Sequence, residues 1–437
     1  MSNRIVARLL GAAVTASLLV GALVAPAAAA GHTNRWVDDD STAGDGPAQC
    51  DTAAYSVIQI AIDDSSAGDN VYVCPGTYTE QLTIPAGVRV RAIPYRKALL
   101  VAPVTGTGNV VELTGDGARV RGLRIRVDTL GCVVYGVTCT VSVGPSSVGC
   151  AHYDTAILAL GNNDMIRDNY IEAVGDSTLN GPCGFDYGIV VGNHGDSATA
   201  SVTFNWVVNF KVGGILVEDT DSYAFVRRNT IRFFHENECL VIVSTVTPCA
   251  SPVLKPSVNN AFALAFGIGV ESDARADIIK NWVGSGPNAC STGPSYTCAP
   301  GSTPTLNDGI SMTGLDSSET TIVRDNVVRK TTSGIITRVA ADGAVIQDNW
   351  VYDSHYGYQP LGDNDEWHDN HTSGNDFGID VTGSGNNIHD NDFRGNTRGL
   401  DCKDETSGSQ TAGTANTWTN DLGNTNVPDG ICIRDAT

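Results

Sequence analysis

A repeat constrains the fold of this 437-residue chain more than any other feature, and its closest spacings are 21 to 25 residues. Each unit reads glycine, isoleucine, any residue and valine, followed by a short turn and an apolar strand that ends in asparagine. The glycine or its equivalent falls at Gly188, Gly214, Cys239, Gly267, Gly309, Gly334, Gly357, Gly378 and Gly399. The asparagine falls at Asn169, Asn205, Asn229, Asn260, Asn281, Asn326, Asn349, Asn370 and Asn391. Because the two registers advance together, each unit is interpreted as one coil of a solenoid.

Apolar residues alternate within each unit, as in the segments 214–217 and 345–351. A period of two is typical of strands rather than helices. Short strands that pair with their equivalents in the next coil, about 4.8 Å away, bury one continuous core that no coil buries alone. The sequence therefore predicts an all-β parallel β-helix with three strands per coil.

At the repeated asparagines the sequence resembles the pectin-lyase-like superfamily of right-handed parallel β-helices, which stack an asparagine at the turn after the second strand. The segment 68–80 also resembles the opening coil of many members. Asparagine suits such a turn because it tolerates a left-handed backbone and its amide can bond the asparagine above. The resemblance implies a right-handed coil, with Asn326, Asn349, Asn370 and Asn391 stacked at one turn.

The signatures of particular activities in that superfamily are missing from this chain. It has no Gly-x-x-Asp-Phe of pectin methylesterases, no Asp-Pro-His of alginate epimerases and no Arg-x-Pro-x-x-Arg of pectate lyases. The ordered motifs of polygalacturonases are also missing, and Gly192–Asp196 resembles their Gly-His-Gly only distantly, so we interpret His194 as a turn residue. The resemblance predicts a fold and leaves the activity open.

Four segments are expected along the chain. Arg4 and Arg8, the apolar run 9–24 and the alanines 27–30 predict an export signal over 1–30, and no second long apolar run predicts a membrane span. The segment 31–65 contains one amphipathic helix candidate, 51–65, which we expect to cap the first coil as an N-terminal capping α-helix. The β-helix is expected over 66–402, and 403–437 is expected to be a C-terminal cap or tail.

Twelve cysteines, all downstream of the export signal, predict disulfides in an oxidising compartment. No CxxC pair supports a zinc site. Proximity along the chain suggests the pairs Cys50–Cys74, Cys132–Cys139, Cys150–Cys183, Cys239–Cys249, Cys290–Cys298 and Cys402–Cys432.

The formal net charge of -21 disfavours partners that carry many negative charges. Nucleic acid and anionic membrane surfaces are therefore poor candidates. Neutral glycans, cations and calcium-bridged acidic polymers remain open. We expect a secreted, extracellular monomer whose partner is a polysaccharide.

Acidic residues recur on the solvent side of the strand that follows the repeat glycine. The candidate catalytic residues are Glu218, Glu238, Glu271, Asp308 and Arg338. Two coils separate Glu218 from Glu271 in the predicted register, which places their backbones about 9.6 Å apart. Inverting glycoside hydrolysis needs two carboxyls at about that distance, and crowding would raise one pKa. Arg338 could instead be the base of a lyase, the acids could bind Ca²⁺, or they could form a solvated acidic face.

Aromatic residues follow the ladder asparagines on the outward side of the third strand. The candidate substrate-binding residues are Tyr170, Trp206, Trp282 and Trp350, and His371 follows in the same position. Flat rings in a row can stack on sugars, although they can also pack beneath side loops. Trp350 has the shortest following loop and is the best binding candidate. Separately, the acids 38–40 could ligate calcium, but they lack an Asp-x-Asp-x-Asp-Gly loop.

Two functions are consistent with these features. The leading hypothesis is a secreted carbohydrate-active protein that binds an extracellular polysaccharide and cleaves it as a lyase or a glycoside hydrolase. The alternative is a non-catalytic extracellular binding or structural β-helix protein. The first needs convergent acids with perturbed pKa values, and the second does not.

Overall fold

The structure is a computed structural model of the chain, which divides into two units, Met1–His32 and Thr33–Thr437. It describes residues 32–40, 46–103, 106–128, 152–174, 184–193, 195–233, 265–285, 289–290, 303–304, 306–315, 320–397 and 399–434. The helices and strands of the described residues all belong to the second unit. The expected export signal, 1–30, lies outside the described residues, among which no helix is long and apolar enough to cross a membrane.

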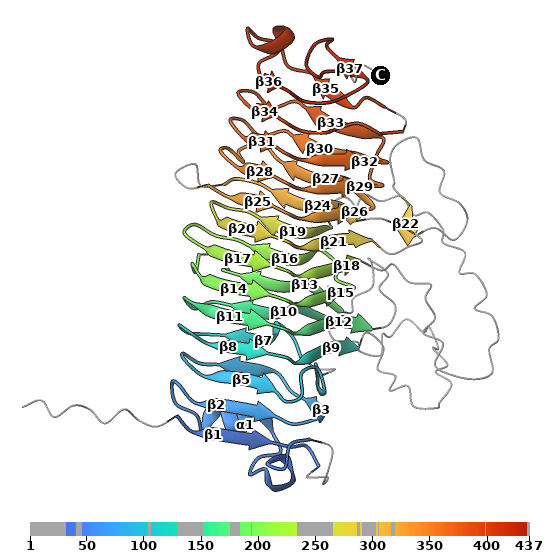
Figure 1. Ribbon diagram of the computed structural model, residues 1–437. Coiled ribbons are helices and arrows are strands. Elements are labelled where there is room, and N and C mark those ends of the chain that lie inside the picture. Colours follow the sequence, from blue (N-terminus) through green and yellow to red (C-terminus); the bar gives the residue numbers. More distant parts are fainter. Residues whose placement is uncertain are drawn as a thin grey trace, which may run out of the picture. The chain divides into compact units, whose positions relative to one another are not determined.

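Three long parallel sheets stack their strands coil upon coil (Figure 1). Sheet A has thirteen strands: β1 Asn34–Val37, β2 Asn70–Val73, β5 Arg89–Ala92, β8 Arg119–Arg121, β11 Asp164–Arg167, β14 Thr199–Thr203, β17 Tyr223–Arg227, β20 Arg275–Ile279, β25 Ile322–Arg324, β28 Val345–Gln347, β31 Glu366–His368, β34 Asn387–His389 and β36 Thr417–Thr419. Sheet B has ten: β3 Gly76–Thr79, β6 Ala98–Val101, β9 Arg124–Asp128, β12 Tyr170–Val174, β15 Trp206–Val208, β18 Thr230–Phe233, β21 Trp282–Ser285, β26 Val327–Arg329, β29 Trp350–Tyr352 and β32 His371–Ser373.

Sheet C has twelve strands: β4 Leu82–Ile84, β7 Asn109–Leu113, β10 His152–Ala159, β13 Gly184–Val191, β16 Gly213–Val217, β19 Phe266–Val270, β24 Leu306–Met312, β27 Thr331–Thr337, β30 Tyr356–Pro360, β33 Phe377–Val381, β35 Cys402–Asp404 and β37 Asn426–Val427. A fourth, two-stranded sheet pairs β22 Ala289–Cys290 with β23 Thr303–Pro304. Each coil visits sheets A, B and C in that order, and alternate residues of each strand fill one continuous core. The predicted parallel β-helix is confirmed.

A ladder of asparagines follows the strands of sheet A. The Nδ2 of Asn349 donates to Oδ1 of Asn370 at 3.0 Å, and Asn370 donates in turn to Asn391 at 3.0 Å. The residue before each asparagine has a left-handed backbone, as at Asp348 with φ 54°. The ladder runs through Asn169, Asn205, Asn229, Asn281, Asn326, Asn349, Asn370 and Asn391 and ends on Asp421. The predicted stacking is confirmed for Asn326, Asn349, Asn370 and Asn391.

The predicted register is wrong at one coil. Asn229 bonds directly to Asn281, and strand β16 pairs directly with β19, so no coil carrying Cys239 and Asn260 separates them. The repeat glycines also stack directly from Gly214 to Gly267. A Cβ at Gly214 would lie 2.6 Å from the carbonyl oxygen of Gly267. Only hydrogen takes up so little space, which explains the repeated glycine. At the other end the column passes from Gly378 to Asp401 rather than to Gly399.

The N-terminal helix is shorter than expected. Helix α1 spans Ile58–Asp63 and buries Ile58, Ala61 and Ile62, while the 3-10 turn Cys50–Thr52 precedes it. The carboxylate of Glu80 accepts hydrogen bonds from the amides of Ile58 and Gln59 at 2.9 Å each, which satisfies two free donors at the start of the helix. Its capping role remains a prediction. Sheet A itself already begins at β1, before the expected start of the β-helix at residue 66.

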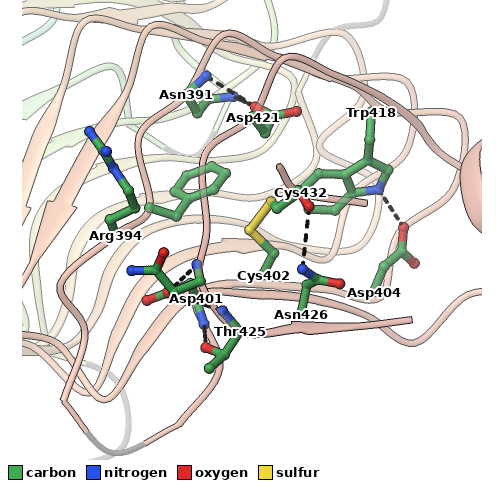
Figure 2. The surroundings of a disulfide bond; sticks show 12 residues. Asn391, Arg394, Asp401, Cys402, Asp404, Trp418, Asp421, Thr425, Asn426 and Cys432 are labelled. Atoms are coloured by element: carbon green, nitrogen blue, oxygen red, sulfur yellow. Dashed lines mark hydrogen bonds between the residues drawn. A yellow bond between two sulfur atoms is a disulfide. The ribbon is translucent and has the colours of Figure 1, made fainter. Parts of the chain in front are cut away.

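The strands also continue beyond the expected end at residue 402. Strands β36 and β37 add to sheets A and C, a second 3-10 turn spans Thr411–Gly413, and the indole of Trp418 donates to Asp404 at 2.8 Å (Figure 2). The disulfides Cys50–Cys74 and Cys402–Cys432 form as predicted near the two ends. The four other predicted pairs involve residues outside the described part of the chain.

Candidate functional site

Glu218 and Glu271 lie side by side on the outer face of sheet C. Each follows a strand whose last residue is buried, and those residues, Val217 and Val270, are direct partners in the register. The two glutamates therefore belong to adjacent coils, with backbones about 4.8 Å apart. The separation of two coils and about 9.6 Å expected from the sequence is wrong, because β16 pairs directly with β19.

The phenol of Tyr187 lies close enough to these two carboxylates to be influenced by their charge. The pKa of Tyr187 rises to about 12, first because burial disfavours its phenolate and then because Glu271 and Glu218 repel the negative charge. Its ring packs 6.3 Å from that of Phe266, at the start of the strand that leads to Glu271. Burial also raises the pKa of Glu271, and the nearby guanidinium of Arg338 partly opposes that rise.

Asp308 and Arg338 form an ion pair across the same face. Asp308 is almost fully buried at the start of the strand β24, whereas Arg338 follows the end of β27, one coil further along. The arginine side chain runs back along the sheet, and its Nε donates to the hydroxyl of Ser311 at 3.3 Å. Burial raises the pKa of Asp308, while Arg338, Ser311 and Ser333 counteract that rise. This network fixes the direction of the guanidinium.

The structure thus places four of the candidate residues on one face of sheet C. They lie in or directly after four successive strands, with Glu218 after β16, Glu271 after β19, Asp308 in β24 and Arg338 after β27. Glu238 lies outside the described residues. Sequence reasoning missed Ser311 and Ser333, which occupy outward positions of the register but carry small hydroxyls that no motif distinguishes. Gln359, which accepts a hydrogen bond from the hydroxyl of Ser333, lies in the next strand of the same sheet.

The polar face continues towards the C-terminus. Lys403 pairs with Asp380 at 3.3 Å and with Glu405, and burial raises the pKa of Asp380. The rings of Tyr356 and Phe377 stack 5.2 Å apart beside this group. Sheet C therefore carries charged, hydroxyl and aromatic side chains on several coils, interrupted by buried apolar residues such as Leu216 and Ile336.

The aromatic residues that follow the ladder asparagines form a column on a different sheet, sheet B. In sheet B the register aligns Tyr170, Trp206, Thr230, Trp282, Val327, Trp350 and His371. Trp350 is 43% exposed and stacks on His371 at 4.3 Å, and Trp206 is 37% exposed. Arg232 lies between Trp206 and Trp282, 5.5 and 4.9 Å from their rings. The predicted alignment of these residues is present, although part of their ring surface already faces cations.

The three N-terminal aspartates also lie together. The carboxylates of Asp38, Asp39 and Asp40 can approach within 4.8 Å of one another, and Asp39 accepts a hydrogen bond from the amide of Thr77 at 2.7 Å. The possibility that they bind Ca²⁺ remains a prediction.

Comparison with known proteins gives a partial family match and several similar solved structures. A family described as periplasmic copper-binding protein (NosD) matches residues 265–433, which is less than half of the chain. No curated protein matches the chain in sequence. Several solved structures are also similar to this chain, at low sequence identity.

Three of these structures are enzymes that act on polysaccharides. A pectate lyase has 13% identity and a TM-score of 0.46 over 81% of this chain and 78% of its own. An alginate lyase has 11% identity and a TM-score of 0.44 over 89% of this chain and 43% of its own. The polygalacturonase of Erwinia carotovora has 12% identity and a TM-score of 0.42 over 93% of this chain and 97% of its own. Function has to be argued from the residues.

Copper does not fit the side chains described in the matched region. Cupric ions favour imidazole ligands that converge on one point. His368 and His389 instead stack in parallel, 5.0 Å apart with 1° between their planes, and their Nδ1 atoms face Asp369 and Asp390. Among the described residues, the group of three potential ligands that lie close enough is Asp38–Asp40, outside the match.

Proposed function

We propose that this chain is an exported carbohydrate-active protein that binds a polysaccharide on sheet C and cleaves it by glycoside hydrolysis. The observation that carries the proposal is the placement of Glu218 and Glu271 on adjacent coils, beside the fixed guanidinium of Arg338. Two disulfides among the described residues support export to an oxidising compartment.

The spacing of the two glutamates favours a retaining mechanism. Retaining enzymes place their carboxyls about 5–5.5 Å apart, and glutamates that extend in parallel from backbones about 4.8 Å apart can reach that separation. Inverting enzymes need a wider separation to admit a water between the carboxyls. The corrected register thus replaces the inverting geometry that the sequence suggested.

The environments of the two carboxyls suggest their roles. Burial raises the pKa of Glu271, which favours its protonated form and suits it to give a proton to the glycosidic oxygen. Glu218 attacks the anomeric carbon as that oxygen leaves, which breaks the glycosidic bond and forms a glycosyl ester. Glu271 then takes a proton from water, whose oxygen displaces Glu218 and releases a sugar of retained configuration.

Asp308 acts as a positioning residue in this scheme. Its buried carboxylate holds Arg338 across the face, so the guanidinium can donate to hydroxyl or carboxylate oxygens of the bound sugar. The aromatic column of sheet B, above all Trp350, supplies stacking faces for more distant parts of the polymer.

The test is the release of reducing ends from a panel of neutral and acidic polysaccharides. Glu271→Gln and Glu218→Gln should each lower the rate by about 10²–10⁴-fold without altering the melting temperature. Glu366→Gln is the matched control, because Glu366 lies half-exposed on sheet A. Proton NMR of the first product should detect the retained anomer.

The outcomes distinguish the alternatives. Full activity in both Gln variants, or an inverted first product, would overturn the assigned roles. If the wild type binds a polymer but cleaves none, the non-catalytic binding function holds instead. In that case Trp350→Ala should weaken binding by about 1 kcal/mol, while Trp350→Phe keeps most of it.

A further inference from the structure

Sheet A carries a stripe of arginines near its N-terminal end. Arg91, Arg121 and Arg167 are direct partners in successive strands, and Arg227 follows after one intervening threonine. In the neighbouring outward position, Arg89 pairs with Arg119. These six residues form the arginine stripe. They alternate with buried core residues and so lie on the outer face of sheet A.

Few carboxylates balance these charges. Asp168 pairs with Arg121 at 2.9 Å and with Arg167 at 3.3 Å. Arg91 donates to the hydroxyl of Tyr95 at 2.7 Å. Arg89 and Arg119 have no ion pair among the described residues, and in both the Nε–H is buried without an acceptor. The guanidinium groups therefore repel one another within a chain whose formal net charge is -21.

The geometry of the stripe indicates the shape of its ligand. Identical cations recur at the coil spacing of about 4.8 Å along the axis of the β-helix. This spacing is close to the length of one sugar residue in an extended glycan. Guanidinium groups bind carboxylate and sulfate oxygens through paired hydrogen bonds. An anionic polymer with a regular repeat would meet one arginine per unit.

We propose that the arginine stripe binds a linear anionic polysaccharide that runs parallel to the helix axis. This surface is separate from the carboxylates of sheet C and goes beyond the proposed hydrolytic function. A membrane surface fits less well, because a broad anionic plane would also face the acidic remainder of the protein. Nucleic acid meets the same repulsion with a higher charge density.

The experiment measures binding of the full chain to dextran sulfate and polygalacturonate, with uncharged dextran and duplex DNA as comparison polymers. Wild-type binding to one or both anionic glycans should weaken steeply as salt rises, because bound counterions are released from the polymer. Preference between the two distinguishes sulfate from carboxylate as the ligand group. The double variant Arg89→Gln/Arg119→Gln should bind at least about tenfold more weakly, since two of six cations are lost.

Two further variants make the test specific. Arg89→Lys/Arg119→Lys keeps the charge and should retain most of the affinity, which also separates lost binding from lost folding. Arg329→Gln/Arg434→Gln removes two exposed arginines elsewhere and should bind like the wild type. Binding that is unchanged in the first Gln variant, equal loss in the control, or equal affinity for uncharged dextran or DNA would overturn the proposal.

Discussion

At the scale of single residues, burial sets the protonation of several turn carboxyls. Asp164, Asp365 and Asp421 each have a pKa raised to about 7, mainly because burial disfavours the charged form. The folded state therefore holds these protons more tightly than the unfolded chain. Their contribution to stability is complete below about pH 4 and is lost as pH rises through about 7.

Asp365 provides a direct test of this linkage. Its amide donates to Oδ1 of Asn386, and that asparagine occupies the equivalent turn one coil later, where its Nδ2 donates to the carbonyl of Gly362 at 3.1 Å. Asp365→Asn should therefore fit the turn and raise the free energy of unfolding at pH 8 by at least about 1 kcal/mol, because one pKa unit is about 1.4 kcal/mol. Urea unfolding at pH 4 should detect no such gain.

The control for this prediction is Asp429→Asn, since the Asp429 side chain is 86% exposed. It should leave stability unchanged at both pH values. An Asp365→Asn gain of equal size at pH 4 and pH 8 would point to better packing rather than to the buried charge.

The candidate site was only partly predictable at this scale. Outward positions after the repeat glycine identified Glu218, Glu271 and Arg338, because alternation in a strand fixes which side chains face solvent. The contact between Asp308 and Arg338 was not predictable, since it runs diagonally from one end of a strand to the other end of the next. Neither the hydroxyls of Ser311 and Ser333 nor the buried state of Asp308 has a sequence signal.

At the scale of elements, the turns after sheet A determine how the coils stack. The asparagine ladder was predictable because its spacing repeats and a side-chain amide can bond the asparagine above. The expectation that asparagine itself takes the left-handed backbone is wrong, since that conformation falls on the residue before it, as at Asp348. The false coil at Cys239 and Asn260 has the right residue types in the right order. Strand pairing, however, depends on backbone hydrogen bonds between β16 and β19, which local composition does not encode.

Asn349 tests how much one ladder position stabilises the fold. It donates through Nδ2 to Val323 at 2.8 Å and accepts from the amide and side chain of Asn326 at 3.0 Å. Asn349→Ala should lower the free energy of unfolding by about 2–4 kcal/mol, because several buried groups lose their partners. Asn387→Ala, on the exposed side of β34, should change it by less than about 0.5 kcal/mol in the same urea titration. If both substitutions changed the free energy of unfolding by the same small amount, the ladder would not stabilise the fold.

At the scale of the whole solenoid, each coil is stabilised by its neighbours, so the last coil has support on one side only. The disulfide Cys402–Cys432 joins β35 to the segment that follows β37, 30 positions further along the chain, and Asn426 donates to the carbonyl of Cys432 beside it (Figure 2). A link of this length stabilises by about 3–4 kcal/mol in the chain-entropy model. It compensates for the missing neighbour.

Cys402→Ser/Cys432→Ser should therefore loosen the C-terminal coils alone. Hydrogen exchange should become faster in β35, β36 and β37, while β16 and β19 in the middle of sheet C keep their protection. Uniformly faster exchange throughout the chain would instead mean that the solenoid unfolds as a single cooperative unit. Unchanged exchange at the C-terminus would contradict a stabilising role for the disulfide.

The central claim is that the carboxylates of sheet C act on a bound polysaccharide. The most direct measurement is a crystal structure of Glu271→Gln with an oligosaccharide of a polymer that the wild type cleaves. We expect a glycosidic oxygen within hydrogen-bonding distance of the side-chain amide introduced by that substitution, the anomeric carbon facing Glu218, and Arg338 contacting the same sugar. An oligosaccharide that occupies another face, with sheet C free of sugar, would contradict it.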